Sequence, residues 1–366
     1  MPLKICHITT VHPRYDVRIF HKECKSLADS YEVHLIVADG KGDEVADGIH
    51  LHDIGKPSGR RERMLRFSKL SLQKAVEIDA AVYHFHDSEL LSVGKKLARK
   101  GKIVIYDSHE DLPRQILTKP WIPKFMRKTV SVLTEIIENH HVRKLSAVIA
   151  ATPHIRQRFQ KVTKKPVGCV CNYPILDEIT VNEDWSSKEK AVCYVGGIFV
   201  ERGIREMVVA ADKSETTLKL AGKFSPDSLQ TEIEQEKGWD RVDYYGFVGR
   251  KEINRLLAES MAGLLLLHPL PSYVDSLPIK LFEYMAAGIP VICSDFPLWR
   301  DIVETNHCGI CVNPSDTDAV ADAIQNLVNH PACAAEMGAN GRKAAVARYS
   351  WDSQADLLKR FYQSLL

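Results

Sequence analysis

The sequence lacks long apolar runs and any repeated spacing of cysteines. No apolar stretch approaches the roughly 20 residues of a membrane-spanning helix, and no secretory hydrophobic segment follows Met1. Cys308 and Cys311 form a Cys-x-x-Cys pair, but no second pair completes a zinc site. These absences predict a cytoplasmic protein with reduced cysteines that binds no structural metal.

The chain also has little net charge, +2 over 366 residues, but the charge is unevenly divided. Residues 1–170 carry 30 Lys and Arg against 19 Asp and Glu, while residues 171–366 carry 19 against 28. A basic half favours a polyanionic or membrane partner on that side only. No nucleic-acid-binding motif or aromatic platform accompanies the basic charge, so no nucleic-acid partner is predicted.

Short apolar runs alternate with helical patterns in both halves of the chain. This alternation predicts an α/β protein of two doubly wound, Rossmann-like parallel-sheet domains. The length also exceeds that of one typical domain. We expect a first domain over 1–171, a polar linker over 172–190 and a second domain over 191–350, with a last helix over 351–366.

Polar side chains follow three predicted strands of the first domain: His12, Asp16 and Arg18, then His86 and Asp87, then His109 and Glu110. Because the carboxyl ends of parallel strands meet at one edge of a sheet, we expect one cleft there. The alternatives to a binding role are structural. Asp16 would cap the following helix with Arg18 in solvent, and His109 would cap the helix that follows it. The His-x-His-Asp spacing is compatible with metal ligation, but a site needs further ligands at fixed geometry, so no metal is predicted.

A segment at residues 117–128 mixes large apolar side chains with four cations, Lys119, Lys124, Arg127 and Lys128. Such a mixture suits a surface of anionic headgroups and acyl chains. The alternative is a helix that packs its apolar side inward. We predict weak, salt-sensitive binding to an anionic membrane surface, peripheral on its inner face.

The second domain carries its polar residues at two strand-to-helix turns. In 262–295 a buried strand leads through a loop with Asp275 into a helix with Lys280 and Glu283 on one face. Earlier, Gly196-Gly197 follows a strand and Arg202 comes five residues later. Glycines permit close backbone approach and free helix N–H groups receive phosphates, so both turns suit an anionic ligand.

These motifs resemble the family 4 retaining glycosyltransferases, whose signature is two acids separated by seven residues before a small-residue helix end and a strand. Asp275 and Glu283 have that spacing within PSYVDSLPIKLFEYMAAGIPVI. The first acid is usually Glu followed by Gly-Phe-Gly, whereas this chain has Asp275-Ser276-Leu277-Pro278, as in one branch of the family. His12, Asp16 and Arg18 fit a shared His-x-x-x-Asp-x-Arg-Ile-Phe pattern.

The resemblance implies the GT-B fold, in which two domains face each other across a cleft and the last helix packs back on the first. It implies that Arg202 and Lys280 neutralise the donor diphosphate, Glu283 binds the ribose, Asp275 binds the transferred sugar and His109 approaches the reacting centre. Further expected contacts are, for the donor, Gly196, Gly197, Phe247, Val248, Ser276 and Leu277, and for the acceptor, His12, Asp16, Arg18, His86, Asp87 and Glu110. No cofactor is implied beyond the nucleotide-diphosphate sugar, UDP- or GDP-linked, as co-substrate.

The expected activity is sugar transfer to a glycan or polyprenyl-linked acceptor in cell-surface polysaccharide synthesis. One alternative is a nucleotide-sugar 2-epimerase of related two-domain build, which needs no acceptor cleft. Another is a non-catalytic polyanion-binding protein that uses only the basic half.

Overall fold

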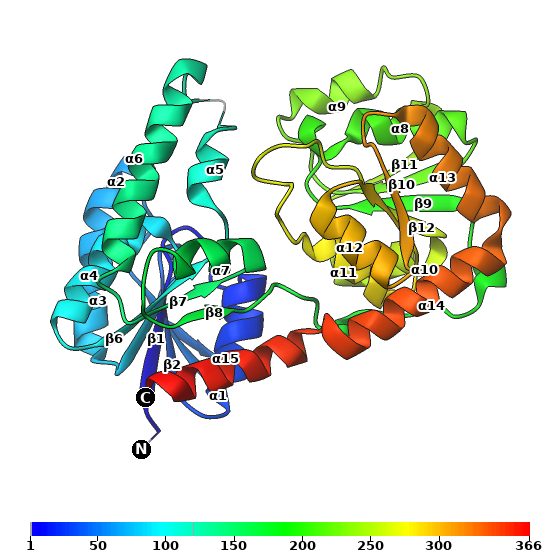
Figure 1. Cartoon of the computed structure of the whole chain (residues 1–366). Helices are drawn as coiled ribbons and strands as arrows, with labels where there is room; N and C mark the ends of the chain where they lie inside the picture. The colour runs from blue at the N-terminus through cyan, green and yellow to red at the C-terminus, as the bar shows by residue number, and fades with distance from the viewer. Residues whose placement is uncertain (1, 120) are drawn as a thin grey trace. The chain divides into compact units, whose positions relative to one another are not determined.

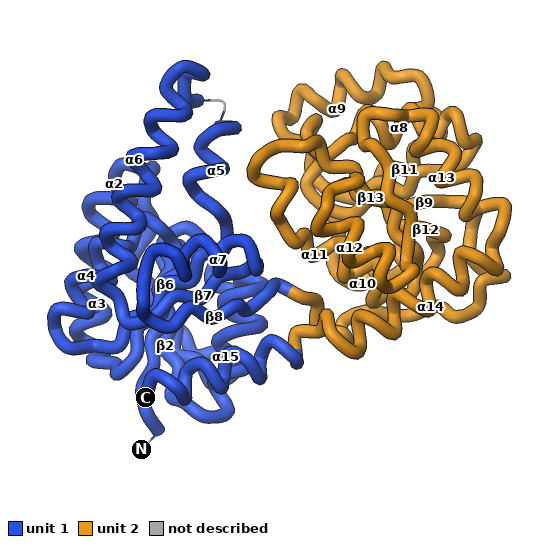
Figure 2. Tube along the Cα trace, in the orientation of Figure 1, with its two compact units in different colours: residues 1–172, 352–366 blue, residues 173–351 orange. Residues whose placement is uncertain are grey.

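The computed structural model describes residues 2–119 and 121–366, which form two compact units. Unit 1 comprises Met1–Asn172 and Asp352–Leu366, and unit 2 comprises Tyr173–Trp351 (Figure 2). Most of the segment predicted as a linker belongs to unit 2, where Trp185 packs against the core. Among the described residues, no helix combines the length and apolar character needed to cross a membrane.

The sheet of unit 1 has the order β3-β4-β2-β1-β5-β6-β7-β8, and its pairs are parallel except β3 with β4 (Figure 1). The strands are β1 (Lys4–Ile8), β2 (Glu32–Val37), β3 (Glu44–Ala46), β4 (Ile49–Asp53), β5 (Val82–Phe85), β6 (Ile103–Ser108), β7 (Ala147–Ala150) and β8 (Val167–Cys169). The chain leaves β1 in both directions, as the doubly wound prediction requires. The short antiparallel β3 was not predicted, because its exposed residues carry no apolar pattern.

One face of this sheet packs on a shared apolar core with four helices: α3 (Ser68–Ile78), α4 (Leu91–Arg99), α6 (Lys124–Val142) and α7 (Pro153–Gln160). The other face differs, because His7 of β1 and His84 of β5 point there in register. It is covered by the π-helical segment η1 (Val17–Cys24), which α1 (Lys25–Ala28) continues, and by α15 (Trp351–Leu365). The short helix α2 (Arg60–Glu62) leads through η2 (Arg63–Phe67) into α3. Two further short helices of the unit are η3 (Ser88–Leu90) and α5 (Leu112–Ile116).

Unit 2 is a second doubly wound sheet with the order β11-β10-β9-β12-β13-β14, parallel throughout. Its strands are β9 (Ala191–Val195), β10 (Thr217–Ala221), β11 (Val242–Gly246), β12 (Ala262–Leu265), β13 (Val291–Ser294) and β14 (Gly309–Val312). Its helices are α8 (Ile204–Lys213), α9 (Ser228–Ile233), α10 (Arg250–Glu259), α11 (Ile279–Ala286), α12 (Pro297–Thr305), α13 (Thr317–Asn329) and α14 (Pro331–Arg348). Both faces are covered by apolar clusters, which explains the continuous apolar runs of its strands.

The cysteines are free thiols in this fold. Cys308 is fully buried and its Sγ donates to the carbonyl oxygen of Val303, whereas Cys311 Sγ lies 3.8 Å from Cys293 Sγ on the neighbouring strand. The Cys-x-x-Cys spacing therefore reflects a helix-to-strand turn.

Candidate functional site

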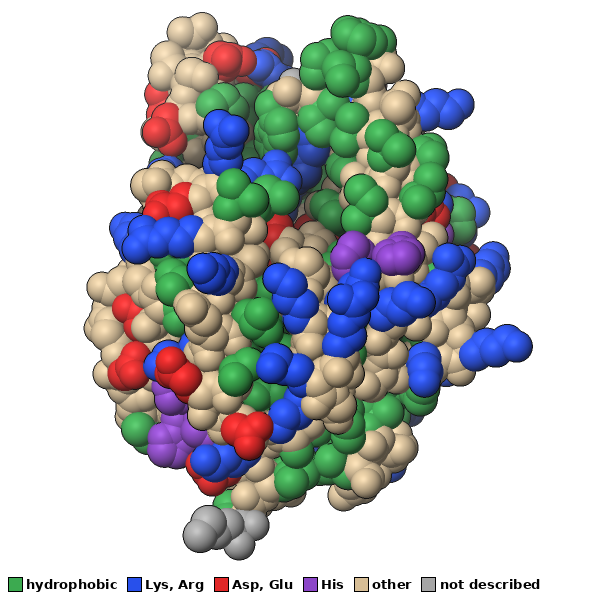
Figure 3. Space-filling model, turned by 90° about the vertical axis from the view of Figure 1, so that its left-hand side faces the viewer, with side chains coloured by type: hydrophobic (Ala, Val, Ile, Leu, Met, Phe, Trp, Pro, Cys, Tyr) green, Lys and Arg blue, Asp and Glu red, His purple; other side chains and the backbone are tan. Residues whose placement is uncertain are grey.

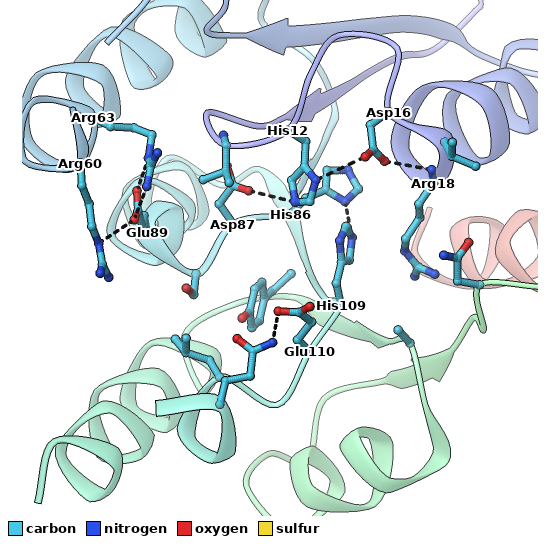
Figure 4. A pocket seen from close by; sticks show the side chains of 18 of the residues that line it. His12, Asp16, Arg18, Arg60, Arg63, His86, Asp87, Glu89, His109 and Glu110 are labelled. Carbon is cyan, nitrogen blue, oxygen red and sulfur yellow. Dashed lines mark hydrogen bonds and ion pairs between the residues drawn. The ribbon is translucent and has the colours of Figure 1, made fainter. Parts of the chain in front are cut away.

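A pocket of about 670 Å³ opens at the carboxyl edge of the sheet of unit 1. It is lined by side chains that follow β1, β5 and β6 (Figure 4). These include His109 and all the predicted acceptor-side residues: His12, Asp16, Arg18, His86, Asp87 and Glu110. The pocket lies at the switch point between β1 and β5, where the chain leaves the sheet centre in opposite directions. The residues that the sequence placed on three separate strand ends are therefore brought together.

Asp87 and Asp16 shape this pocket by holding the loop that follows β1. The buried Asp87 carboxylate accepts hydrogen bonds from the backbone N–H groups of Thr10 (2.6 Å) and Val11 (3.2 Å) and from the hydroxyl of Thr9. Asp16 caps η1, since its Oδ1 accepts from the N–H groups of Arg18 and Ile19 at 2.9 Å. The capping alternative for Asp16 is thus correct, and the carboxylate also faces the pocket.

His12 bridges these two carboxylates, with Nδ1 3.4 Å from Asp16 Oδ2 and Nε2 3.6 Å from Asp87 Oδ1. Burial alone lowers the pKa of His12, but the hydrogen bond to Asp16 and the charge of Asp87 outweigh burial and raise it. Burial raises the pKa of Asp16, yet the hydrogen bonds from His12 and the Ile19 N–H hold it below its usual range. The two carboxylates consequently favour the protonated form of His12, which lines the pocket.

Arg18 is not in solvent: its side chain is 5% exposed and anchors a buried ion cluster. Its Nη2 donates to Asp107 at 3.0 Å, its Nη1 donates to the carbonyl of Val170 at 2.9 Å, and its Nε lies 3.0 Å from Glu23. Burial raises the pKa of Asp107, but the Arg18 guanidinium overcomes this and holds it well below the usual value. Burial, followed by the charge of Asp107, raises the pKa of Glu23. The Arg18 guanidinium thus favours the charged form of Asp107, whereas burial and the charge of Asp107 disfavour the charged form of Glu23.

A chain of histidines connects this cluster to the pocket. His109 Nε2 lies 3.0 Å from Asp107 Oδ2 and 3.1 Å from His86 Nδ1, and His86 Nε2 lies 2.9 Å from His7 Nδ1. Tyr362 of α15 lies 2.8 Å from His84 Nδ1 and 3.3 Å from His7 Nε2. Asp107 therefore orients His109, which lines the pocket as His86 does.

Some of these histidines belong to a group that could in principle bind a metal ion. His7, Glu23, His84 and His86 have ligand atoms within 4.8 Å of one another. Ligands bound at about 2.1 Å in a tetrahedron lie about 3.4 Å apart. Here Glu23 Oε2 lies 3.9–4.0 Å from the three histidine nitrogens, whereas His7 and His86 are already hydrogen-bonded at 2.9 Å. The geometry and the nearby Arg18 charge favour a hydrogen-bonded network over ligation.

The rest of the pocket is basic and aromatic. Arg63 donates to Glu89 at 2.8 Å and Arg60 lies 3.5 Å from it, while Glu110 is engaged by Gln115. Lys119 Nζ lies 5.1 Å from the centre of the Trp121 ring, and both residues line the rim. An aromatic ring beside cations suits an acceptor that combines a sugar with a phosphate.

In unit 2, the loop after β9 forms a crowded backbone turn. Gly196 has φ +140°, and a Cβ there would lie 2.3 Å from Cε of Lys280. A Cβ on Gly197 would lie 2.7 Å from the Phe199 ring, and the Gly197 carbonyl accepts from Arg202 Nη1 at 3.1 Å. Only glycines leave room for these two cationic side chains over the turn.

Arg202 and Lys280 form a pair of like charges around this turn. Burial, then the charge of Arg202, lowers the pKa of Lys280 to about 8. The Lys280 ammonium lies 5.4 Å from the centre of the Tyr194 ring, and the buried Arg202 Nε has no hydrogen-bond partner among the described residues. Two close cations at a parallel-sheet switch point, with one donor unused, leave a positive charge that an anion would balance.

Glu283 lies one turn after Lys280 on α11, and its Oε1 accepts from Arg250 Nη1 at 2.8 Å. Asp275 is exposed on the loop before α11, and Ser276 and Leu277 follow it half-buried, with the Ser276 carbonyl accepting from Trp299 Nε1 at 2.7 Å. Phe247 and Val248 follow β11, where Phe247 is 89% exposed. The structure thus places these residues on turns at the carboxyl edge of one sheet.

Several important residues were not predicted: Glu23, Asp107, Tyr194, Arg250 and Tyr362. The hydroxyl of Tyr362 is hydrogen-bonded to His84, which lies 278 positions away in the sequence, so no local sequence pattern predicts this contact. Asp107 lies within β6 and is fully buried, and the alternation of side chains along a strand is the signal that could have found it.

The profile of the family described as Glycosyl transferases group 1 matches residues 177–344, which lie within unit 2. A curated relative, α-D-kanosaminyltransferase from Streptomyces kanamyceticus, is 26% identical over 248 residues, which cover 62% of this chain and 63% of the relative. Another relative is a GDP-mannose-dependent α-(1-6)-phosphatidylinositol monomannoside mannosyltransferase of Mycobacterium tuberculosis. It is 36% identical over 88 residues, which cover 24% of this chain and 23% of the relative. The chain thus spans less than two thirds of the length of these relatives.

Solved structures cover nearly the whole chain. Sucrose-phosphate synthase from Thermosynechococcus elongatus has a TM-score of 0.80 at 18% identity and covers 99% of both chains. HepE from Anabaena, in complex with UDP and glucose, has a TM-score of 0.73 at 16% identity, over 99% of this chain and 100% of HepE. At these identities the likeness shows the fold, and the predicted GT-B type of two parallel-sheet domains is confirmed.

The first prediction concerns acid stability. Burial is the largest cause that lowers the pKa of His7, His84 and His86, the last to about 4, so all three are neutral in the folded state. Because unfolded histidine titrates near pH 6.5, stability is full above about pH 6.5 and falls as pH drops, by about 1.4 kcal/mol per pH unit for each histidine. His84→Gln should remove one histidine's share of that slope in urea unfolding between about pH 6.5 and pH 5.

Exposed His330→Gln is the matched control and should leave the slope unchanged. A slope that His84→Gln leaves as steep as that of wild type would contradict the account of this network.

The second prediction concerns Lys280. With its pKa near 8, Lys280 loses its charge as pH rises through 8. The dissociation constant of a nucleoside diphosphate, measured by calorimetry, should therefore rise about tenfold between about pH 7 and pH 9.5. Lys280→Arg keeps a cation at every pH and should flatten the profile. A wild-type profile as flat as that of Lys280→Arg would remove Lys280 from the anion site.

Proposed function

We propose that this protein is a retaining glycosyltransferase. It would move a sugar from a nucleotide-diphosphate donor, UDP- or GDP-linked, bound by unit 2, to an acceptor bound in the pocket of unit 1. The acceptor would be a glycan or a lipid-linked sugar of a cell-surface polysaccharide. No cofactor beyond the donor is proposed.

The observation that carries the proposal is the unbalanced cation pair, Arg202 and Lys280, over the Gly196-Gly197 turn. A nucleoside diphosphate leaves as an anion, so its charge grows in the transition state, where fixed cations lower the barrier. The family profile spans this region, and HepE, which shares the fold, is described with UDP and glucose. In this proposal Glu283 binds the ribose and Asp275 the transferred sugar.

The other donor contacts proposed lie on turns around the same edge of the sheet. Phe247 and Val248 would meet the base, and Ser276 and Leu277 would line the sugar site beside Asp275. Arg250, which holds Glu283 at 2.8 Å, would position that carboxylate.

The pocket of unit 1 supports an acceptor with hydroxyl and anionic groups. His109 faces it and is oriented by Asp107 at 3.0 Å, so its orientation is fixed before a substrate binds. His12, Asp16 and Glu110 add polar groups around the opening, while Arg18, His86 and Asp87 support them from below. An epimerase would leave this second pocket without a role.

The third prediction tests the function. A panel of UDP- and GDP-sugars is screened for thermal stabilisation of the protein and for release of the nucleoside diphosphate. The donor found should be turned over about 100-fold more slowly by Arg202→Ala, with less than about tenfold change in its dissociation constant, because leaving-group charge grows in the transition state. Product analysis distinguishes transfer from epimerisation, and the anomeric configuration of the product tests retention.

Arg205→Ala is the matched control, since Arg205 lies only three residues after Arg202, on α8, but pairs with Glu232 and Glu236. A loss of donor affinity with unchanged turnover for Arg202→Ala would show uniform binding and contradict the role of Arg202 in the transition state. A protein that binds polyanions but turns over no nucleotide sugar would contradict the enzymatic proposal.

A further inference from the structure

Helix α6 exposes a row of apolar side chains and buries Ser131, Glu138 and Val142 on its other side. Phe125 is 84% exposed, Met126 is 44% exposed, and four further apolar side chains are 51–59% exposed: Val132, Leu133, Ile136 and Ile137. Their spacing of three, four and seven residues places them along one side of a 19-residue helix about 28 Å long. We call these six residues the α6 stripe. Contiguous apolar surface of this kind marks an interaction site.

The contacts on the inner side of α6 explain why the stripe is free. Ser131 donates to the carbonyl of Pro113 at 2.6 Å, and Glu138 accepts from Tyr106 at 3.0 Å and pairs with Arg158 at 2.8 Å. Arg127 donates to the carbonyl of Ile122 at 2.8 Å. The inner side of α6 is thus attached to unit 1 by these polar contacts and by Val142 in the apolar core, and none of the stripe residues belongs to that core.

Arg127 also corrects the sequence prediction. Of the four cations predicted to meet a membrane, Arg127 is engaged with backbone carbonyls, whereas Lys124 and Lys128 are exposed on α6 and Lys119 lies at the pocket rim. The cationic surface is therefore smaller at this end than predicted, but the apolar surface is much longer.

The charges around the stripe are of one sign. Lys124 and Lys128 lie at its first end, and Arg143 and Lys144 are exposed just beyond its last turn. Within α6, all of whose residues are described, both acidic side chains are paired with arginines of unit 1. Figure 3 shows the pattern on the face it presents, where hydrophobic side chains gather above two histidines and a band of Lys and Arg.

This charge pattern selects the occupant of the stripe. A second copy of α6, parallel or antiparallel, would bring cations against cations at both ends, which disfavours a pair. An anionic lipid surface accepts the apolar stripe and attracts the cations at both ends. We propose that α6 is an interfacial helix that docks the protein on an anionic membrane.

The position of the pocket gives this surface a role. Lys119 and Trp121, which is 63% exposed, line the pocket and precede α6 directly in the chain. A docked α6 therefore brings the pocket mouth to the headgroup region, where an acceptor with a lipid anchor would enter. This role rests on the proposed function, whereas the docking itself does not.

The fourth prediction is tested by sedimentation of the whole protein with vesicles. Wild type should bind vesicles of equal parts phosphatidylglycerol and phosphatidylcholine, and not vesicles of phosphatidylcholine alone. Leu133→Ser with Ile136→Ser should weaken binding at least about tenfold, because two apolar side chains lose their burial. Lys124→Gln with Lys128→Gln should weaken it about 25-fold at low salt and less at high salt.

Val346→Ser with Leu357→Ser is the matched control, since both side chains are exposed apolar residues on other helices, and it should bind as wild type does. Absence of binding to anionic vesicles, or binding unchanged by both α6 double variants, overturns the proposal. A dimer in solution that Leu133→Ser with Ile136→Ser dissociates would assign the stripe to a second copy instead. Turnover of the soluble donor, measured on the same variants, separates failure of docking from failure of the enzymatic proposal.

Discussion

Both units depend on one constraint of parallel sheets, the switch point. When a chain starts at a central strand and leaves it in both directions, the two loops that follow neighbouring strands diverge and open a crevice between them. In unit 1 this crevice lies between β1 and β5, and in unit 2 between β9 and β12. The pocket and the Gly196-Gly197 turn both lie there, so fold and candidate sites share one cause.

The buried charges at the two switch points are arranged in opposite ways. In unit 1 the buried Arg18 guanidinium is balanced by Asp107, whose pKa it holds well below the usual value, while burial raises the pKa of Glu23 and lowers the pKa of His7, His84 and His86. In unit 2 the cations Arg202 and Lys280 lie together, and burial lowers the pKa of Lys280. A cluster whose charges are balanced stabilises and orients its neighbours. A cluster with excess positive charge attracts a ligand of negative charge. We therefore propose an orienting role for the first and diphosphate binding for the second.

The sequence predicted the architecture and the pocket because both are local consequences of strand ends. His12, His86 and His109 each follow an apolar run, and parallel strands then require them to meet. Contacts between distant segments carried no such signal: Tyr362 with His84, and Arg250 with Glu283, became visible only in the fold. The sequence also does not show whether the apolar side chains between residues 117 and 128 are exposed or buried.

The α6 stripe shows why that decision needed the structure. An apolar pattern at helical spacing ordinarily predicts the side that packs inward. Here the buried side is chosen by Ser131 and Glu138, whose partners Pro113, Tyr106 and Arg158 lie elsewhere in the chain. Helical periodicity gives the direction of a face but not which of two faces the rest of the protein covers.

Hydrogen exchange of backbone amides on addition of a nucleoside diphosphate tests most directly the claim that the two units divide the donor and acceptor roles. The account predicts slower exchange over residues 195–203 and 276–283 of unit 2, because the diphosphate contacts the Gly196-Gly197 turn and the start of α11. Residues 9–16 and 107–111, around the pocket of unit 1, should exchange at the same rate with and without the nucleotide. Slower exchange confined to the pocket of unit 1, with no change around Gly196 and Lys280, would contradict it.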